Sequence, residues 1–398
     1  MTFSYIKQIK VNDCFTHQDF SVPKEELKTL RHIVLTGKNG SGKTTILNRI
    51  AYILSLLQQD GQTQDVALRK IKGTLNANLK HSHKPKWEEQ IGFLEDVELK
   101  YLTDVNENLI KKSDEIIISY FKANRKIELK DVNTVTKEKE FLISLKKENK
   151  TDDFISQFKQ YLVNKKVYEA FDFMNSKKKK INQSKIFFDR LTETLQSIFN
   201  DKNIELEFIQ ENFEFYIIFE DNRRVTFNQL SEGFSAFLSI IMDLLMRTDL
   251  IRKSKNDYNL EPEGIVIIDE PETHFHLSMQ YEILPLINRL FPKIQLIIAT
   301  HSPAIISSIE NAIVYDLSSK DQVSEWILGS SYSELMVNHF GLDNEYSSIA
   351  DKIIYDVNQA VKDKNVEKLK QIMIENEKVL TPSLRIEIES QIIHIESL

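Results

Sequence analysis

Two kinds of hydrophobic pattern alternate along this chain. Short runs of apolar and β-branched residues, which are typical of strands, occur at 5–11, 15–22, 32–36, 265–268 and 295–299. The last two runs are apolar at nearly every position, as in strands that are buried on both faces of a parallel sheet. By contrast, Ile and Leu recur at three- to four-residue spacing over 44–57, which predicts a helix. Together these patterns predict an α/β fold.

The middle of the chain follows a different pattern. Strands are predicted at 93–102 and 115–121, whereas residues 60–90 are polar and allow no assignment. From about residue 134, lysines and acids mix with apolar residues at three- to four-residue spacing. Residues 137–200 are therefore predicted to form helices that are inserted into the sheet domain.

Strand patterning resumes after this insertion. Residues 204–208 and 213–219 predict a hairpin whose turn lies near residue 211. A helix is expected to follow from about Ser231. The last part of the chain, from about residue 331, has the spacing of amphipathic helices.

A glycine-rich loop lies between the predicted strand at 32–36 and the predicted helix at 44–57. Its sequence matches G-x-x-x-x-G-K-[ST] in the strand–loop–helix context of phosphate-binding loops, which a chance glycine turn would not reproduce. Backbone N–H groups of such a loop turn toward phosphate oxygens, and the helix N-terminus favours their negative charge. The residues expected to bind ATP are Gly37, Asn39, Gly40, Ser41, Gly42, Lys43, Thr44 and Thr45.

Two acids end the apolar run at 265–268. Asp269 and Glu270 are expected at the carboxyl edge of a parallel sheet, where ligands of α/β proteins bind. Beside a phosphate loop, Asp269 and the Thr44 hydroxyl would hold Mg²⁺, and Glu270 would polarise the water that attacks ATP. The alternative for the two acids is a solvated acidic turn.

Two further motifs flank the acidic strand. Leu230-Ser231-Glu232-Gly233-Phe234 precedes it, and Ala299-Thr300-His301-Ser302-Pro303 follows the next apolar run. The first motif resembles the L-S-G-G-Q signature of ABC ATPases, although Glu232 and Phe234 depart from the transporter form. His301 is placed like the switch histidine of that family. The alternatives are an ordinary helix N-cap at Ser231 and a buried structural histidine at position 301.

The order of phosphate loop, insertion, signature, acidic strand and histidine resembles the ABC ATPase family, and more closely its SMC-like, non-transporter branch. The string D-E-P-E-T-H-F-H-L from Asp269, with A-T-H-S-P downstream, is similar to the stand-alone ATPases of bacterial anti-phage defence. These include the ATPase subunits of Septu-type and retron systems, and residues 331–343 also look like the tail of that group. One departure is that no glutamine closely follows 116–121, so the glutamine-bearing loop of the family is not matched.

The resemblance implies roles for the matched residues. Glu270 and His301 would be the catalytic residues of an ATP hydrolase. Ser231 and Gly233 would contact the γ-phosphate that is bound to the other subunit. Because the phosphate loop and the signature occur in one chain, a homodimer whose ATP sites are completed in trans is the simplest assembly.

The resemblance also implies an architecture and a biological role. The chain is expected to be an ABC-type ATPase head of the P-loop class, whose parts are a first lobe at 1–136, a helical insertion at 137–200, a second lobe at 201–345 and a helical tail at 346–398. It would regulate a separate effector, such as an HNH-type nuclease, in anti-phage defence, because the chain carries no nuclease pattern of its own. The alternatives are an SMC-like DNA-repair or recombination ATPase that acts on DNA, and the ATPase subunit of a transporter.

The cysteine content and the lengths of the apolar runs bear on the cellular compartment that is expected for this chain. The single cysteine, Cys14, excludes an internal disulfide framework and fits a reducing compartment. The N-terminus lacks the apolar run of a signal peptide, and no stretch reaches the roughly 18 apolar residues of a membrane span. A cytoplasmic protein without a membrane partner is therefore expected.

Nucleic acid is a weaker candidate partner. The net charge of −7 does not attract it to the protein as a whole, so a contact would need a local basic surface. The candidate residues are Lys122, Arg125, Lys126, Lys130 and the four lysines at 177–180. Because acids are interspersed with these residues, the alternative is a solvated helical face.

Overall fold

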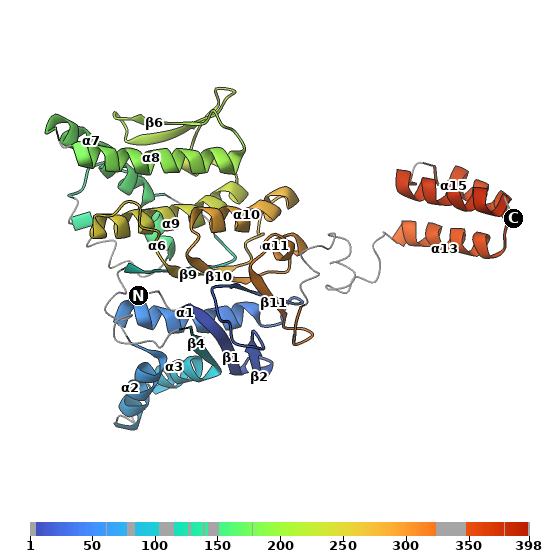
Figure 1. Ribbon diagram of the computed structural model, residues 1–398, viewed down its shortest axis with the longest axis horizontal. Helices are drawn as coiled ribbons and strands as arrows, with labels where there is room; N and C mark the ends of the chain where they lie inside the picture. The colour runs from blue at the N-terminus through green and yellow to red at the C-terminus, as the bar shows by residue number, and fades with distance from the viewer. Residues whose placement is uncertain are drawn as a thin grey trace. The chain divides into compact units, whose positions relative to one another are not determined.

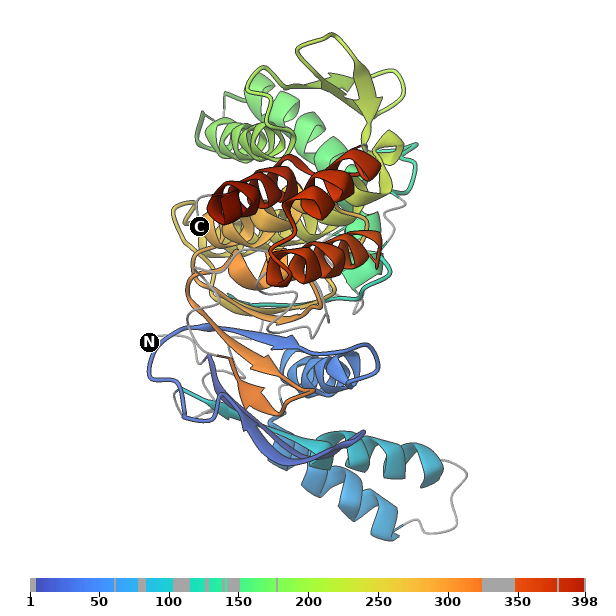
Figure 2. The ribbon, with the colours of Figure 1, turned by 90° about the vertical axis from the view of Figure 1, so that its right-hand side faces the viewer.

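A computed structural model describes most of the chain, which forms two compact units at residues 1–329 and 330–398. The described residues are 5–60, 62–77, 84–102, 115–125, 129–137, 140–141, 151–176, 178–323, 348–377 and 379–396. Figure 1 and Figure 2 show the elements from two directions.

The first unit is built on a six-stranded sheet in the order β12-β11-β3-β10-β9-β5. Its strands are β3 (His32–Thr36), β5 (Ile117–Phe121), β9 (Gly264–Asp269), β10 (Ile294–Ala299), β11 (Ala312–Asp316) and β12 (Asp321–Gln322). All neighbours pair in parallel except β11 and β12. Every residue of β3, β9 and β10 is buried, because other elements cover both faces of the sheet (Figure 1). The predicted α/β fold with buried parallel strands is confirmed.

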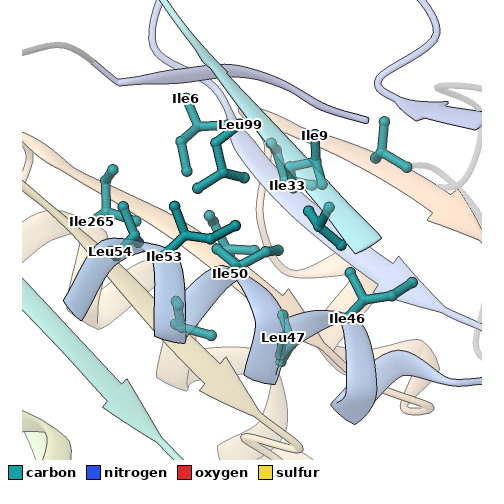
Figure 3. Close-up of a cluster of buried hydrophobic side chains, with 14 of the residues drawn as sticks. Ile6, Ile9, Ile33, Ile46, Leu47, Ile50, Ile53, Leu54, Leu99 and Ile265 are labelled. Atoms are coloured by element: carbon teal, nitrogen blue, oxygen red, sulfur yellow. The ribbon is translucent and has the colours of Figure 1, made fainter. Parts of the chain in front are cut away.

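Helix α1 (Lys43–Asp60) packs between this sheet and a second, antiparallel sheet. The strands of the second sheet are β1 (Ile6–Cys14), β2 (His17–Val22) and β4 (Val97–Tyr101). Figure 3 shows the apolar side chains of α1 in one cluster with those of both sheets. Ile46, Ile50 and Ile53 are at most 1% exposed, and burial of each such side chain contributes about 1.5–3 kcal/mol. This core holds the N-terminal end of α1, and with it the glycine-rich loop, in place.

A buried glutamine joins the two sheets. The Gln295 side chain of β10 is 0% exposed. Its Nε2 donates to the Ile6 carbonyl at 2.8 Å and to the Arg31 carbonyl at 2.9 Å, while its Oε1 accepts from the Ile6 N–H at 2.8 Å. Both amide donors and the amide oxygen therefore have partners, so the burial of this polar group is compensated and β1 is tied to the start of β10.

The described residues after α1 include two helices, α2 (Gln64–Ala77) and α3 (Lys84–Asp96), which pack against each other. The predicted strand at 93–102 is wrong in its first part, because α3 continues to Asp96 and β4 begins only at Val97. Leu94 is 2% exposed and belongs to the core around α1. It follows Trp87 at helical spacing, and packing on α1 favours the helix over the strand that the local apolar run predicts.

Helices also form where the insertion was expected, as α6 (Thr151–Ser156), α7 (Phe158–Met174) and α8 (Lys178–Phe199). The predicted hairpin is confirmed as β6 (Glu205–Ile209) and β7 (Glu214–Ile218), and β8 (Arg224–Thr226) adds a third strand. A 3-10 turn, η2 (Phe227–Gln229), then leads into the largely buried helix α9 (Glu232–Lys255).

The helices after α9 are divided between the units at 1–329 and 330–398. In the first unit, α10 (Leu277–Leu290) and α11 (Pro303–Ser307) follow β9 and β10. The second unit contains α13 (Ser348–Lys362), α14 (Val366–Glu375) and α15 (Pro382–Glu396), which share a core of their own. Leu369 and Ile372, which have the spacing of an amphipathic helix, are buried in it. The stretch at 331–343 lies outside the described residues. In the described part of the chain, no helix is both long enough and apolar enough to cross a membrane.

A buried histidine gives the fold a pH dependence. His32 is 1% exposed, and its Nδ1 accepts a hydrogen bond from the Leu296 N–H at 3.0 Å. Burial lowers the pKa of His32 to about 4, although a hydrogen bond with Asn288 partly opposes the shift. An unfolded histidine has a pKa near 6.5. As the pH falls from about 6.5 to 4, the unfolded chain therefore gains a proton that the folded protein does not, and stability is lost over that window.

We expect this single residue to remove about 3 kcal/mol from the free energy of unfolding between pH 7 and pH 4. His32→Asn keeps an acceptor for the Leu296 N–H but does not titrate, so its free energy of unfolding should fall less over the same range. Urea unfolding at a series of pH values measures this difference. His394→Asn, which changes an exposed histidine of α15, is the control and should follow the wild type. Parallel curves for wild type and His32→Asn would contradict the assignment.

Candidate nucleotide-binding site

The glycine-rich loop connects β3 directly to α1 at the carboxyl edge of the parallel sheet. Gly37, Gly40 and Gly42 have φ values of +134°, +78° and +86°, which side-chain-bearing residues rarely adopt. The sequence therefore needs glycine at these positions to turn the backbone N–H groups inward. A β-carbon at Gly37 would also lie 2.8 Å from Ser318 Oγ and 3.0 Å from Asp316 Oδ1.

The segment that follows β11 holds the glycine-rich loop through hydrogen bonds. The Lys38 N–H donates to Ser318 Oγ at 2.8 Å. The Ser318 N–H in turn donates to Asp316 Oδ1 at 2.7 Å, and Asp316 is itself buried. The conformation of the loop thus depends on a strand that lies almost 280 residues further along the chain.

The side chain of Lys43 lies inside this loop. It is 6% exposed, and its Nζ donates to the Gly37 carbonyl at 2.8 Å and to the Lys38 carbonyl at 3.2 Å. Burial lowers the pKa of Lys43, while the nearby carboxylates, Glu270 first among them, oppose that shift. The loop therefore holds an ammonium group in a partly desolvated position, where a bound anion would stabilise its charge.

Asp269, at the end of β9, meets the start of α1. Its side chain is 2% exposed and forms a hydrogen bond with the Thr44 side chain. Burial raises the pKa of Asp269 and Glu270 adds to this effect, while the Thr44 hydrogen bond, Arg125 and Lys43 lower it. The structure thus brings together the two residues that the sequence predicts as magnesium ligands.

Some polar atoms at this site have no protein partner. Asp269 Oδ1 and Ser41 Oγ are buried and accept or donate no hydrogen bond within the described part of the chain. Buried polar atoms normally have partners, so a pair of this kind is typical of a binding site. A carboxylate oxygen next to a threonine hydroxyl fits Mg²⁺, and a serine hydroxyl in a glycine-rich loop fits a phosphate oxygen.

Arg125 is a residue of this site that the sequence did not reveal. It follows β5 by four residues and is 6% exposed. Its guanidinium donates to the backbone carbonyls of Lys122 and Asp269, both at 2.8 Å, and to that of Glu270 at 3.0 Å. Arg125 therefore holds the backbone of the acidic turn, which is formed by Asp269 and Glu270. It lies just after β5, where the glutamine-bearing loop of the family would be expected.

This position corrects one prediction. The sequence makes Arg125 a candidate for a local basic surface, but its charge is buried against three carbonyl groups. Lys122, Lys130, Lys179 and Lys180 are exposed. Lys126 and Lys177 lie outside the described residues. No local signal distinguishes a buried arginine from an exposed one in such a lysine-rich stretch.

The acidic turn also brings Glu270 and His301 together. Glu270 has a φ of +46°, an unfavourable backbone conformation for a residue with a side chain, of the kind found at functional sites. His301 Nδ1 lies 3.6 Å from Glu270 Oε1 and 3.2 Å from Glu272 Oε1. Glu272 is 6% exposed and also accepts hydrogen bonds from the Thr300 hydroxyl at 2.7 Å and the His301 N–H at 2.9 Å. Glu272 therefore positions His301, a role that the sequence did not reveal.

The signature motif lies apart from the phosphate loop of its own chain. Ser231 is the exposed N-cap of α9, and its hydroxyl does not cap the helix. A β-carbon at Gly233 would lie 2.5 Å from the His274 carbonyl, so glycine is needed here for close backbone approach. The exposed Glu232 carboxylate lies 3.7 Å from His274 Nδ1. In the described part of the chain, no hydrogen bond or ion pair joins this motif to residues 37–45.

Relatives with known names match part of this chain. The retron Ec83 "probable ATPase" of Escherichia coli is 32% identical over 123 residues, which is 28% of this chain and 22% of that protein. The Septu protein PtuA of Bacillus thuringiensis is 26% identical over 197 residues, or 46% of this chain and 49% of that protein. The matched region thus spans half or less of these relatives' own lengths. The predicted resemblance to Septu and retron ATPases is confirmed.

A solved structure and a family model complete the comparison. An SMC head bound to the C-terminal winged-helix domain of ScpA covers 78% of this chain and 93% of its own, with 11% identity and a TM-score of 0.38. The family model described as "AAA domain, putative AbiEii toxin, Type IV TA system" matches residues 33–307, from β3 to the end of α11. Because this match covers well over half of the chain and includes the phosphate loop, the acidic turn and His301, the chain belongs to this family of ATPase domains.

Proposed function

We propose that this protein binds ATP with Mg²⁺ at the carboxyl edge of its parallel sheet, hydrolyses it slowly, and thereby regulates a separate effector protein. The observation that carries the proposal is the meeting of Lys43, Thr44, Asp269, Glu270 and His301 at one point. These residues lie at or just after the carboxyl ends of three buried strands, β3, β9 and β10. Convergent polar groups at such an edge, of which Lys43 and Asp269 have shifted pKa values, are characteristic of an active site.

Each side chain has a distinct part in hydrolysis. Lys43 would bind the β- and γ-phosphates, and Thr44 and Asp269 would hold an Mg²⁺ ion, which would supply positive charge beside them. Glu270 orients and polarises the attacking water, which forms a new P–O bond as the bond to the ADP oxygen breaks. His301, held through Glu272, donates a hydrogen bond to the transferred phosphoryl group. Arg125 keeps the acidic turn in position for these contacts.

A second copy of the chain would complete each site. Ser231 and Glu232 of the signature and His274 of the following segment are exposed, and they lie near one another because Gly233 packs against the His274 carbonyl. Leu277 and Tyr281, one turn apart on α10, are 47% and 38% exposed beside them. An apolar pair next to an unsatisfied helix N-terminus fits a protein interface. In a head-to-head homodimer, Ser231 and Gly233 of one subunit would reach the γ-phosphate bound to the other.

The relatives support a role in anti-phage defence. In this role, the bound nucleotide would set the geometry of the dimer, and the dimer would hold or release an effector according to that geometry. The proposed effector is an HNH-type nuclease on a separate chain. The protein would act in the cytoplasm. Affinity purification with and without phage challenge tests this role, because a nuclease that co-purifies in a phage-dependent manner supports it. Direct DNA-end processing by the purified ATPase alone would instead favour the DNA-repair alternative.

We expect Glu270→Gln to lower ATP hydrolysis by about 100-fold or more, because the amide keeps the shape of the side chain but cannot polarise water. ATP binding should remain, and the closed dimer should accumulate. Phosphate release and size-exclusion chromatography with ATP measure the two effects. Glu310→Gln, at an exposed position, is the matched control. A wild-type hydrolysis rate in Glu270→Gln would rule out this role.

Asp269→Asn should stabilise the nucleotide-free protein while abolishing magnesium-dependent hydrolysis. Burial raises the pKa of Asp269, so its ionised form is less stable in the folded protein than in the unfolded chain at neutral pH. Removing the charge should therefore raise the unfolding temperature. Asp221→Asn is the control, because Arg223 lowers the pKa of this exposed carboxyl, and it should give no increase. A lower unfolding temperature for Asp269→Asn would contradict the argument.

Sites completed in trans predict complementation between two inactive subunits. Lys43→Ala damages the phosphate loop and Ser231→Arg the signature. A mixed dimer carries both lesions in one composite site and leaves the other site intact. Verified heterodimers should therefore recover about half of the wild-type activity per dimer. If they recover none, each subunit completes its own site or the motif at 230–234 has another role.

A further inference from the structure

The helical insertion contains a cavity that is separate from the candidate ATP site. It has a volume of about 470 Å³ and lies between α7, α8 and the C-terminal end of α9. Its aromatic walls come from Phe141, Tyr161, Tyr168, Phe171 and Tyr258. None of its lining residues belongs to the phosphate loop, the acidic turn or the signature. The volume is within the range of about 300–1,000 Å³ that is usual for small-molecule sites.

Three lysines contribute positive charge to this cavity. Lys165 is paired with the buried Asp249 at 2.9 Å. Lys253 lines the cavity and is exposed at its rim. Partial desolvation lowers its pKa, so an incoming anion would stabilise its charged form. Lys180 is exposed at the edge of the cavity. Against Asp172 and Asp249, the three lysines leave a net positive charge.

The aromatic side chains form surfaces on which a planar group can stack. Phe141 and Tyr161 are buried and stack on each other, with ring centroids 6.1 Å apart at an interplanar angle of 27°, and Tyr161 donates a hydrogen bond to Asp249. The partly exposed rings that a ligand can reach are those of Tyr168 and Phe171. Phe171, which lines the cavity, is 51% exposed. Phe173 and Met174, just beyond it at the end of α7, are 73% and 79% exposed. Large apolar side chains exposed next to lysines are typical of sites that stack bases and bind phosphates.

We propose that this cavity binds a nucleotide, with its base against Tyr168 and Phe171 and its phosphate on Lys253 and Lys180. The amide side chains of Asn175 and Gln183, which also line the cavity, offer donors and acceptors for the edge of a base. The nucleotide is either a free molecule or one unit of a single strand, because the edge at Phe171 and Lys180 is open to solvent. This proposal is independent of hydrolysis at the phosphate loop.

The test measures binding of AMP, GMP, CMP and UMP, of short single-stranded DNA and RNA, and of inorganic phosphate to the full-length protein by calorimetry. All measurements are made in wild type and in Lys43→Ala, which separates the cavity from the phosphate loop. The cavity variants are Lys253→Gln and Lys180→Gln. The matched control is Lys255→Gln, which changes a lysine of α9 that pairs with Glu115 and does not line the cavity.

We expect Lys253→Gln to weaken nucleotide binding about tenfold or more and Lys180→Gln about threefold, because each removes a charge-assisted contact to phosphate. Lys255→Gln should have no effect. Since Lys180 is exposed, its substitution is not expected to affect folding, so it keeps the test valid if Lys253→Gln is unstable. Loss of mononucleotide binding supports a free nucleotide, and loss confined to oligonucleotides supports a single strand. The proposal is overturned if neither ligand binds, if phosphate alone binds equally well, or if Lys255→Gln has the same effect as the cavity variants.

Discussion

The register of three parallel strands is the constraint on which the candidate site depends. Ala299 of β10 pairs with Leu35 of β3 on one side and with Asp269 of β9 on the other. Two backbone hydrogen bonds continue this alignment past the strand ends, from the Glu270 N–H to the Ala299 carbonyl at 2.8 Å and from the Thr300 N–H to the Leu35 carbonyl at 3.0 Å. The phosphate loop, the acidic turn and the histidine segment therefore leave the sheet at the same level. A shift of one residue in any strand would reverse the faces of its side chains and separate these groups.

The candidate ATP site holds charged side chains in buried positions, where a charge lowers the stability of the folded protein. Lys43, Arg125 and Asp269 are each at most 6% exposed, and buried charges destabilise a fold unless partners compensate them. Carbonyl groups compensate Lys43 and Arg125, whereas one oxygen of Asp269 is left without a protein partner in the described residues. The apolar core around α1 and the saturated Gln295 link offset this cost nearby. The buried amide of the surrounding frame thus has hydrogen-bond partners, whereas the site itself keeps a polar atom without one among the described residues. This contrast is expected of a protein that binds a charged ligand.

The two candidate binding sites use different chemistry for related ligands. At the sheet edge, backbone N–H groups and the buried ammonium group of Lys43 would face the phosphates of the proposed ATP, and none of the residues named there would contact its base. In the insertion, aromatic rings and amide side chains face the cavity and could select a base, while lysines bind the phosphate. The first arrangement suits a nucleotide whose phosphate chain reacts, and the second suits a nucleotide that is only sensed. An insertion that senses a nucleotide would give the proposed regulator an input separate from ATP.

The sequence by itself determined the parts of this protein that depend on local chemistry. The phosphate loop needs glycine at positions 37, 40 and 42 because of its backbone conformation, and the buried strands β9 and β10 need continuous apolar residues, so both were predictable from neighbouring positions. Tertiary structure decided the rest. Arg125, Glu272 and the walls of the cavity owe their roles to partners far away in the chain, and the start of β4 at Val97 depends on how α3 packs on α1. Local patterns could not reveal these features, because burial and hydrogen-bond partners are set only when distant segments meet.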